Sequence, residues 1–430
     1  MDRRFEPAGP LRGALRPPPD KSISHRAALI GAISGAASIG SYLNAADTRA
    51  TLAAVRAVGA ELDVEPGANA LEVEVEIRGP GIRGARGAEI DVGNAGTLLR
   101  LMPGWLAGVE GGKWVLDGDA SIRRRPVDRV AEPLRQMGAR VDCRDGRLPP
   151  LRVEGGPLSG IEYRLPMASA QVKSCLLLAG LLAEGTTTVV EPAPTRDHTE
   201  RMLAAAGAGL EASNGRVSVR PAERLELGSV RVPGDLSSAA FPLVAALLVP
   251  GSEVELTEVG LNPTRSGVLA VLERMGAELE VEESEVTAGE PRGTLHARGS
   301  ALRGVEIGGD DIPLAIDELP LLALAACFAE GETVIRDAAE LRHKESDRIA
   351  TVCEGLVALG GDVEPADDGM TVRGSGGLRG GTLDSHGDHR LALLGAAAGL
   401  ASREGVTVRG FDAAEVSYPG FEASLGSLAG

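Results

Sequence analysis

Apolar positions along the chain form two kinds of helical segment that alternate with short β-like runs. One kind, such as MASAQVKSCLLLAGLLAEG, is rich in Ala, Leu and Gly and apolar nearly all round, which predicts a buried helix. The other kind, such as TRSGVLAVLERMGA, has one polar face and predicts an amphipathic helix. A run such as TTTVV lies between them, and a hairpin-like pair such as LDVEPGANALEVEV follows. The pattern predicts a β-α-β-α-β-β unit.

This unit recurs roughly every 70 residues and occurs six times. Because a helix that is apolar all round must be covered on every side, we expect an α/β fold in which three units pack with these helices inside and their sheets outside. Two such three-unit domains account for the chain, and Pro and Gly place the seams at Pro17–Asp20 and Val232–Asp235. Five amphipathic segments end at a glycine that fits a helix C-terminus: Gly59, Gly138, Gly207, Gly276 and Gly360.

The stretch PPPDKSISHRAALI shows how a buried helix is expected to begin. Ser22 or Ser24 is the expected N-cap, and Lys21 and Arg26 lie close to the free backbone N–H groups. Together with the positive end of the helix dipole, these groups suit a phosphate or a carboxylate. Taken alone, an ordinary capped helix with solvated charges explains the stretch better. The recurrence of the same design changes that balance.

Polar side chains gather at the same place in the other units. The small residues of Asn94-Ala95-Gly96-Thr97 would let backbone approach a ligand, and Pro126 at a first helical position would put Arg125 beside the positive dipole end. Each residue separately has a structural explanation as a cap or a solvated charge. Jointly that explanation is poor, because five of the six histidines and three of the four lysines fall in these windows. The other gathered residues are Ser169, Gln171, Lys173, Arg196, His198, Asp317, Glu318, His343, Lys344, Glu345, Arg348, His386, Asp388, His389 and Arg390.

Two of the gathered carboxylates, Asp317 and Glu345, stand among many cations, which suggests general acid–base catalysis beside phosphate groups. The chain has no metal-ligand spacing, no GxGxxG after a strand, no Walker A motif and no GxSxG. The residues therefore predict a transferase or lyase that needs no metal and acts on phosphorylated, carboxylated small molecules.

Composition narrows the partners and the location. A net charge of −17 and an aromatic content of 2% argue against binding to nucleic acid. No apolar run reaches the ~18 residues of a membrane span, and the first residues lack the apolar core of a signal peptide. Four scattered cysteines indicate neither a zinc site nor a disulfide framework. We expect a cytoplasmic monomer with no membrane or nucleic-acid partner.

Eight short motifs occur in the order DKSISHR, GNAGT, RRRP, SAQ, TRDH, DELP, KESDR and DHR. Each is weak alone, but the ordered set covers essentially the whole chain and resembles the 5-enolpyruvylshikimate-3-phosphate synthase family of enolpyruvyl transferases. The resemblance implies two inside-out α/β barrels of βαβαββ units, with 20–232 as the first domain and 1–19 with 233–430 as the second. It also implies transfer of the enolpyruvyl group of phosphoenolpyruvate to the 5-hydroxyl of shikimate 3-phosphate, with release of phosphate and with no metal or organic cofactor.

The resemblance further implies roles for the matching residues. Asp317 would accept the hydroxyl proton, Glu345 would protonate the methylene carbon of phosphoenolpyruvate, and Lys21 would stabilise the phosphate. Glyphosate, which occupies the phosphoenolpyruvate pocket in this family, is an expected inhibitor. The phosphoenolpyruvate pocket would contain Lys21, Asn94, Gly96, Arg125, Gln171, Arg348, His389 and Arg390. The shikimate 3-phosphate pocket would contain Lys21, Ser22, Arg26, Ser169, Ala170, Gln171, Arg196, Asp317 and Lys344.

Four positions depart from the family pattern. Pro19 replaces the Gly usual before Asp-Lys-Ser and stiffens the seam, and Leu101 replaces a Pro. Ala170 lacks the hydroxyl of a Ser found in some branches, and Val416 stands where some branches place a Lys. The phosphoenolpyruvate pocket is therefore expected to have one cation fewer.

The nearest alternative is the sister enolpyruvyl transferase that acts on UDP-N-acetylglucosamine. That family has Lys-Asn where this chain has Lys-Ser, and many of its members carry a Cys in the loop that reads DGDASIRRRP here. A nucleic-acid end-processing protein is disfavoured by the acidity and the few aromatic residues. A non-enzymatic repeat scaffold would leave the clustered Lys and His unexplained.

Overall fold

In a computed structural model, which describes residues 1–429, the chain forms two compact units. The 19–233 unit contains Pro19–Pro233 and also Val286–Glu290. The 234–429 unit contains Met1–Pro18, Gly234–Glu285 and the chain from Pro291 on. The predicted ranges assigned residues 286–290 to the second domain, whereas the structure groups them with the 19–233 unit.

The 19–233 unit contains three four-stranded sheets, ordered β16-β3-β5-β4, β6-β7-β9-β8 and β11-β13-β15-β14, and a two-stranded sheet β10-β12. Its helices are α1 (Lys21–Ser34), α2 (Ala46–Ala57), α3 (Gly96–Ala107), η1 (Ile122–Arg124), α4 (Asp128–Gln136), α5 (Ala170–Gly180) and α6 (His198–Ala205). Its strands are β3 (Ala36–Leu43), β4 (Glu61–Pro66), β5 (Glu72–Arg78), β6 (Ala88–Asp91), β7 (Lys113–Asp117), β8 (Arg140–Arg144), β9 (Leu148–Glu154), β10 (Leu158–Ser159), β11 (Glu162–Arg164), β12 (Ala183–Glu184), β13 (Thr187–Val190), β14 (Leu210–Ser213), β15 (Arg216–Val219) and β16 (Gly228–Arg231).

The 234–429 unit contains the sheets β18-β19-β17-β2, β20-β21-β23-β22 and β1-β25-β24. Its helices are α7 (Leu236–Leu248), α8 (Gly267–Arg274), α9 (Asp311–Ala315), α10 (Leu319–Phe328), η2 (Ala339–His343), α11 (Arg348–Ala358), α12 (His389–Ala401), η3 (Phe411–Val416) and α13 (Phe421–Leu428). Its strands are β1 (Arg3–Phe5), β2 (Arg12–Leu15), β17 (Glu253–Gly260), β18 (Glu278–Thr287), β19 (Glu290–Arg298), β20 (Glu306–Ile307), β21 (Glu330–Ile335), β22 (Asp362–Pro365), β23 (Met370–Ser375), β24 (Gly381–Asp384) and β25 (Val406–Arg409).

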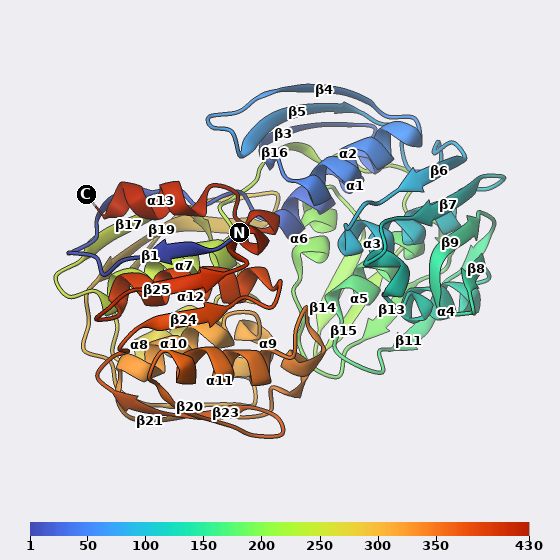
Figure 1. The fold of residues 1–430 in the computed structure, drawn as a ribbon. Coiled ribbons are helices and arrows are strands. Elements are labelled where there is room, and N and C mark those ends of the chain that lie inside the picture. The colour runs from blue at the N-terminus through green and yellow to red at the C-terminus, as the bar shows by residue number, and fades with distance from the viewer. Residues whose placement is uncertain (430) are drawn as a thin grey trace. The chain divides into compact units, whose positions relative to one another are not determined.

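The predicted repeat is confirmed in the sheet order. Five sheets join one parallel strand pair to an antiparallel hairpin, as β6 and β7 join β9 and β8. The sixth sheet has only three strands, β1, β25 and β24. Where the other repeats have a hairpin, β1 from the start of the chain pairs antiparallel with β25 (Figure 1). The last repeat is thus completed by the beginning of the chain.

The first helix of each repeat is buried, as its apolar pattern predicted. All 13 residues of α7 are buried, and so are residues on every side of α1, α3 and α5. Helices α3 and α5 pack so closely that a Cβ at Gly104 would collide with the backbone carbonyl of Cys175. Glycine has no Cβ and therefore allows this approach. Cys175 and Cys327 are buried among apolar residues, as expected for small hydrophobic side chains.

The sequence predicted the C-terminal ends of the helices better than their N-terminal ends. The five predicted C-terminal glycines all have left-handed φ angles, between 86° and 114°. The N-cap prediction for α1 was wrong: Asp20 is the cap, and its Oδ1 accepts the Ile23 N–H at 2.8 Å. Pro126 is not the first residue of a helix either, because η1 ends before it and α4 begins at Asp128.

Residues 286–290, which run from the end of β18 to the start of β19, are held within the 19–233 unit by polar contacts. Glu290 Oε1 lies 2.8 Å from His198 Nδ1, and both side chains are buried. Arg201 Nη1 donates to the Gly289 carbonyl at 3.0 Å, and the Arg231 N–H donates to Thr287 Oγ1 at 3.0 Å.

Within the described residues, no helix is long and apolar enough to cross a membrane.

Candidate active site

Arg26 lies in the second turn of α1 with its guanidinium group held by uncharged oxygens. Its Nε donates to Thr199 Oγ1 at 2.7 Å, its Nη2 to Ser174 Oγ at 3.1 Å and its Nη1 to the Ser22 carbonyl at 3.0 Å. The residue is 3% exposed, and burial lowers the pKa of Arg26 to about 10. At neutral pH the group is a buried cation bound by neutral groups in these three contacts.

Arg100 and Gln171 join the starts of α3 and α5. Arg100 Nη1 donates to Gln171 Oε1 at 2.9 Å, and Gln171 Nε2 donates to Thr97 Oγ1 at 3.2 Å. Burial, and then the charges of Arg129 and Arg125, lower the pKa of Arg100 to about 10. The Gln171 amide is therefore fixed from both ends.

Gly96, the first residue of α3, lies against two guanidinium groups. A Cβ at this position would lie 3.0 Å from Arg125 Nη1 and 3.2 Å from Arg100 Nη1. Arg125 Nη2 also donates to Asn94 Oδ1 at 2.9 Å. The fold thus brings Asn94, Gly96, Arg125 and Gln171 together, and it adds Arg100 to them.

Both lysines gathered in this unit are in ion pairs. Lys21 Nζ lies 3.3 Å from Asp47 Oδ2, at the start of α2. Lys173, 1% exposed, lies 2.9 Å from Glu191 Oε2 and 2.5 Å from Glu200 Oε1. The ammonium group of Lys173 is therefore neutralised inside the core, which indicates a structural role.

The remaining predicted residues of this unit lie at or near helix starts. Ser169 is the N-cap of α5, its Oγ accepts the Val172 N–H at 3.4 Å, and Ala170 is the first residue of that helix. Arg196 lies in the segment before α6, where its charge acts to lower the pKa of Arg26.

In the 234–429 unit, Asp317 lies between α9 and α10 and faces three cationic side chains. Its carboxylate oxygens lie 3.8 Å from Lys344 Nζ, 3.5 Å from Arg348 Nη1 and 3.7 Å from Arg390 Nη2. Lys344 Nζ also lies 2.8 Å from Glu340 Oε1. One carboxylate is thus bordered by cations from three different segments.

Arg348, the first residue of α11 and 1% exposed, is held by carboxylates. Its Nε and Nη2 donate to the two oxygens of Asp388 at 2.8 and 3.1 Å, and Nη2 also donates to Glu345 Oε2 at 2.7 Å. Burial acts to lower the pKa of Arg348, but the hydrogen bonds and charge of Asp388 outweigh it and raise that pKa.

Glu345 and His389 both have shifted pKa values. Burial acts to raise the pKa of Glu345, but the charges of Arg348 and then His389 outweigh it and lower that pKa. Burial, followed by the charge of Arg390, lowers the pKa of His389 to about 4. In the free protein at neutral pH, Glu345 is therefore ionised and His389 is neutral.

Sequence reasoning missed Arg100 and Asp47, and it gathered Glu318 and Asp388 at helix starts without assigning them a role. Arg100 stands four residues after Gly96 and so shares its helix face, a spacing that could have identified it. Asp47 has no comparable signal in the sequence, and the contacts of Glu318 and Asp388 are with partners that are distant along the chain.

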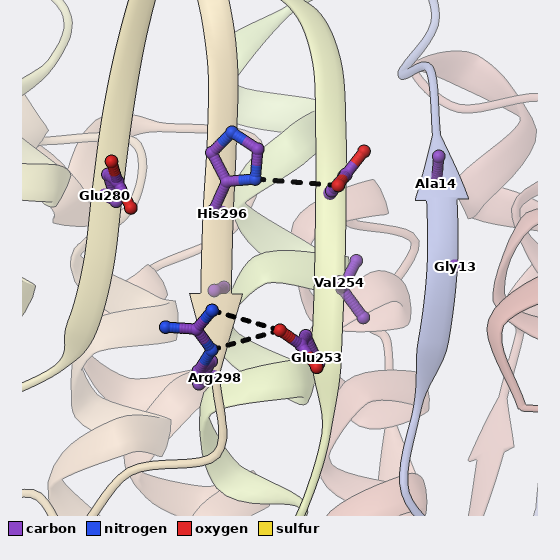
Figure 2. Close-up of a pocket in the computed structure, with 9 residues that line it drawn as sticks. Gly13, Ala14, Glu253, Val254, Glu280, His296 and Arg298 are labelled. Atoms are coloured by element: carbon purple, nitrogen blue, oxygen red, sulfur yellow. Dashed lines mark hydrogen bonds and ion pairs between the residues drawn. The ribbon is translucent and has the colours of Figure 1, made fainter.

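A hollow of about 320 Å³ on the sheet of β17, β18 and β19 contains none of the predicted residues (Figure 2). Arg298 Nη2 lies 3.0 Å from Glu253 Oε1 there, and His296 Nδ1 lies 3.8 Å from Glu255 Oε1. All four side chains are partly or largely exposed, and such pairs hold little free energy in water.

Helix starts in both units carry buried cations, and in the 234–429 unit the carboxylates of Asp317 and Glu345 lie among cations. These groups suit an enzyme that acts on anionic small molecules. More narrowly, the chain belongs to the EPSP synthase family: the family described as EPSP synthase (3-phosphoshikimate 1-carboxyvinyltransferase) matches residues 5–425. The chain is 52% identical over 431 residues to a 3-phosphoshikimate 1-carboxyvinyltransferase of Synechococcus sp. (strain JA-3-3Ab), covering 99% of this chain and 96% of that relative. It is 49% identical to one of Desulfitobacterium hafniense (strain DSM 10664 / DCB-2), covering 97% and 95%. A solved EPSP synthase of Acinetobacter baumannii is similar with a TM-score of 0.91 and 42% identity, covering 99% of this chain and 98% of the other.

Proposed function

We propose that the residues described above carry out the EPSP synthase reaction in this chain. That reaction transfers the enolpyruvyl group of phosphoenolpyruvate to the 5-hydroxyl of shikimate 3-phosphate and releases phosphate, in the shikimate pathway of aromatic amino acid biosynthesis. The observation that carries the proposal is Asp317, whose carboxylate lies 3.5–3.8 Å from Lys344, Arg348 and Arg390. A carboxylate among cations can take a proton beside a bound anion.

The cations of both units neutralise the phosphate and carboxylate groups of the substrates. A guanidinium group held by neutral oxygens, like that of Arg26, keeps more of its charge available to a ligand than one in a salt bridge. In the proposal, shikimate 3-phosphate is bound by Lys21, Ser22, Arg26, Ser169, Ala170, Gln171, Arg196, Asp317 and Lys344. Phosphoenolpyruvate is bound by Lys21, Asn94, Gly96, Arg125, Gln171, Arg348, His389 and Arg390.

The proton transfers follow from the balance of atoms. The 5-hydroxyl oxygen bonds to C2 of phosphoenolpyruvate while Asp317 takes the hydroxyl proton and Glu345 gives a proton to the methylene carbon. Because the product keeps the double bond, that carbon must give a proton back to the Glu345 carboxylate as the C2–O bond to phosphate breaks. The proton taken by Asp317 leaves with the released phosphate. Lys21 stabilises the departing phosphate, which is an electrostatic contribution.

The proton of Glu345 needs a source, since Arg348 lowers the pKa of this carboxyl group. A bound phosphoenolpyruvate anion would compete for the Arg348 charge and repel the carboxylate, and both effects raise the pKa of Glu345. We expect Glu345 to take up its proton when the substrates bind. The pH dependence of kcat should then reveal a higher pKa than that of kcat/KM, which reflects the free enzyme.

The activity is tested by measuring phosphate release from phosphoenolpyruvate with shikimate 3-phosphate, and separately with UDP-N-acetylglucosamine, as acceptor. Release only with shikimate 3-phosphate is expected. Release only with UDP-N-acetylglucosamine would contradict the proposed substrate.

The architectural proposal is that each unit is an inside-out α/β barrel, with domains at 20–232 and at 1–19 with 233–430. It is supported by the full burial of helices such as α7 and by the largely exposed outer strand β4. A cytoplasmic location, a monomeric state and the lack of a nucleic-acid partner stay predictions. Val416 is 55% exposed, and in the proposal its aliphatic side chain leaves the phosphoenolpyruvate pocket one cation poorer than pockets with Lys there.

A further inference from the structure

The carboxylate of Glu318 joins the starts of three buried helices in the 234–429 unit. Glu318 is the N-cap residue of α10 and is 2% exposed. Its Oε1 accepts a hydrogen bond from the Ser237 hydroxyl at the start of α7 and another, 3.3 Å long, from Arg390 Nη1 at the start of α12. A single carboxylate oxygen therefore connects α7, α10 and α12.

The hydroxyl of Ser237 is itself fixed in direction. Arg265 Nη2 donates to Ser237 Oγ at 2.6 Å and to Asp235 Oδ1 at 3.0 Å, and Arg265 is 6% exposed. Because a guanidinium group can only donate, the hydroxyl proton of Ser237 must point to Glu318. The Glu318 oxygen is thereby anchored on the side opposite to Arg390.

Arg390 is divided between two carboxylates. Its Nη1 lies 3.3 Å from Glu318 Oε1, and its Nη2 lies 3.7 Å from Asp317 Oδ2. Since the guanidinium group is planar, two partners on different terminal nitrogens fix its orientation. Without Glu318, the nearest remaining carboxylate for Arg390 would be Asp317, the proposed base.

We propose that Glu318 is a positioning residue that directs Arg390 toward the carboxylate of phosphoenolpyruvate and keeps it from closing onto Asp317. The inference rests on the proposed function, which places Arg390 in the phosphoenolpyruvate pocket. Glu318 acts through Arg390 and touches neither substrate.

The test uses the full chain and compares Glu318→Gln, Arg390→Lys and the double variant. Gln keeps the shape of Glu318 but loses the charge, so the KM for phosphoenolpyruvate should rise about tenfold, as expected for losing a charged hydrogen bond. The dissociation constant of shikimate 3-phosphate, measured by calorimetry, should change less than about twofold. If Glu318 acts through Arg390, the double variant should have the same KM as Arg390→Lys alone.

Three further variants test for a general loss of packing. Ser237→Ala removes the anchor of Glu318 and should raise the same KM roughly threefold, whereas Ser238→Ala, next to it on α7 and also buried, should not. Glu200→Gln removes a buried carboxylate paired with Lys173 in the other unit and should leave the phosphoenolpyruvate KM unchanged.

The outcomes separate this inference from the function on which it rests. A phosphoenolpyruvate KM that Arg390→Lys raises but Glu318→Gln leaves unchanged would overturn the inference alone. Independent, multiplying effects in the double variant would also overturn it, because they indicate a role that does not pass through Arg390. If Arg390→Lys leaves the KM unchanged, the proposed placement of Arg390 is wrong and the inference falls with it.

Discussion

The two units build their cationic sites from the same kind of helix start but give the cations different partners. In the 19–233 unit, Arg26 and Arg100 donate to hydroxyl, carbonyl and amide oxygens, and burial lowers the pKa of both to about 10. In the 234–429 unit, Arg348 and Arg390 donate to carboxylates, and those of Arg348 raise its pKa despite burial. Neutral partners leave charge available for an anionic ligand, whereas carboxylates consume it.

The difference suggests a division of labour. Cations with neutral hydrogen-bond partners should gain much from an arriving anion, because their own hydrogen bonds go to oxygens without a charge, as those of Arg26 do. Cations with carboxylate partners hold acids and bases in place and tune their proton affinities, as Arg348 does for Glu345. In the proposal, the 19–233 unit contributes cations with neutral partners to anion binding, and the 234–429 unit contributes both further cations and the carboxylates that transfer protons.

The largest expected effect is on turnover, when a proposed proton-transfer group of the 234–429 unit is changed. Glu345→Gln should lower kcat by ~10²–10⁴, because it removes a proton donor while keeping its shape. Glu354→Gln, an exposed change on helix α11, which begins three residues after Glu345, is the control. Initial rates over both substrates provide the measurement, and a loss confined to KM would show that Glu345 only binds.

Lys173 departs from the neutral-partner pattern of Arg26 and Arg100, as Lys21 does with Asp47, because its partners are two carboxylates. Lys173→Met should destabilise the protein by about 3–5 kcal/mol, since it leaves Glu191 and Glu200 buried without their cation. The exposed change Lys113→Met should cost less than about 0.5 kcal/mol. Urea titrations measure both, and a rise in substrate KM without loss of stability would place Lys173 among the anion-binding cations instead.

Arg26 tests the neutral-partner half of the comparison. Arg26→Lys keeps the charge but cannot bond Thr199, Ser174 and the Ser22 carbonyl in the same plane. The dissociation constant of shikimate 3-phosphate should rise about 10- to 100-fold. Calorimetric titration measures it, and an unchanged constant would exclude Arg26 from that pocket.

A substitution at Gly96 tests the 19–233 unit further, because Arg125 and Arg100, the two cations beside Gly96, are expected to face an inhibitor. Gly96→Ala would push its Cβ against Arg125 and Arg100, and one misplaced carbon costs ~1–3 kcal/mol. We expect glyphosate to inhibit the parent enzyme, and the ratio of its inhibition constant to the KM for phosphoenolpyruvate to rise in the variant. An equal ratio in the two proteins would mean that Gly96 does not touch the inhibitor.

A further expected effect is on the pH dependence of stability. Burial, and then the charges of Lys21 and Arg26, lower the pKa of His25 to about 3, so the unfolded chain binds more protons than the native one between pH 6.5 and 3. His25 therefore contributes stability above pH 6.5 that is lost as the pH falls through this window, by at most about 1.4 kcal/mol per pH unit. His25→Gln should flatten the dependence, which urea titrations at pH 7 and pH 5 can measure. An identical slope in both proteins would contradict the buried neutral state of His25.

The repeating fold was predictable because the sequence of each repeat carries a recognisable pattern of buried helix, amphipathic helix and hairpin. Asp20 and Pro126 show where local patterns fail: several capping residues compete near each helix start, and tertiary packing chooses among them. The last repeat lacks its hairpin for a similar reason, since the partner of β25 comes from the opposite end of the chain.

The sequence pointed to many of the side chains at the helix starts, but not to their contacts. Asp317 and Glu345 stand out as carboxylates among cations, but the buried partners of Arg348 and Arg390 lie up to 72 residues away along the chain. A single sequence gives no measure of such distances. The distinction between neutral and acidic partners, on which the comparison depends, came only from the folded chain.

The pairing of β1 with β25 also bears on how the protein is made. Strand β1 leaves the ribosome early, but Val406, its neighbour in the sheet, is added about 400 residues later. At the usual pace of translation, Arg3–Phe5 must wait roughly 20–80 s for that neighbour, while the residues of the 19–233 unit emerge in between. The 234–429 unit is thus the last to be completed during synthesis, and a nascent chain arrested before Val406 would carry an incomplete final sheet.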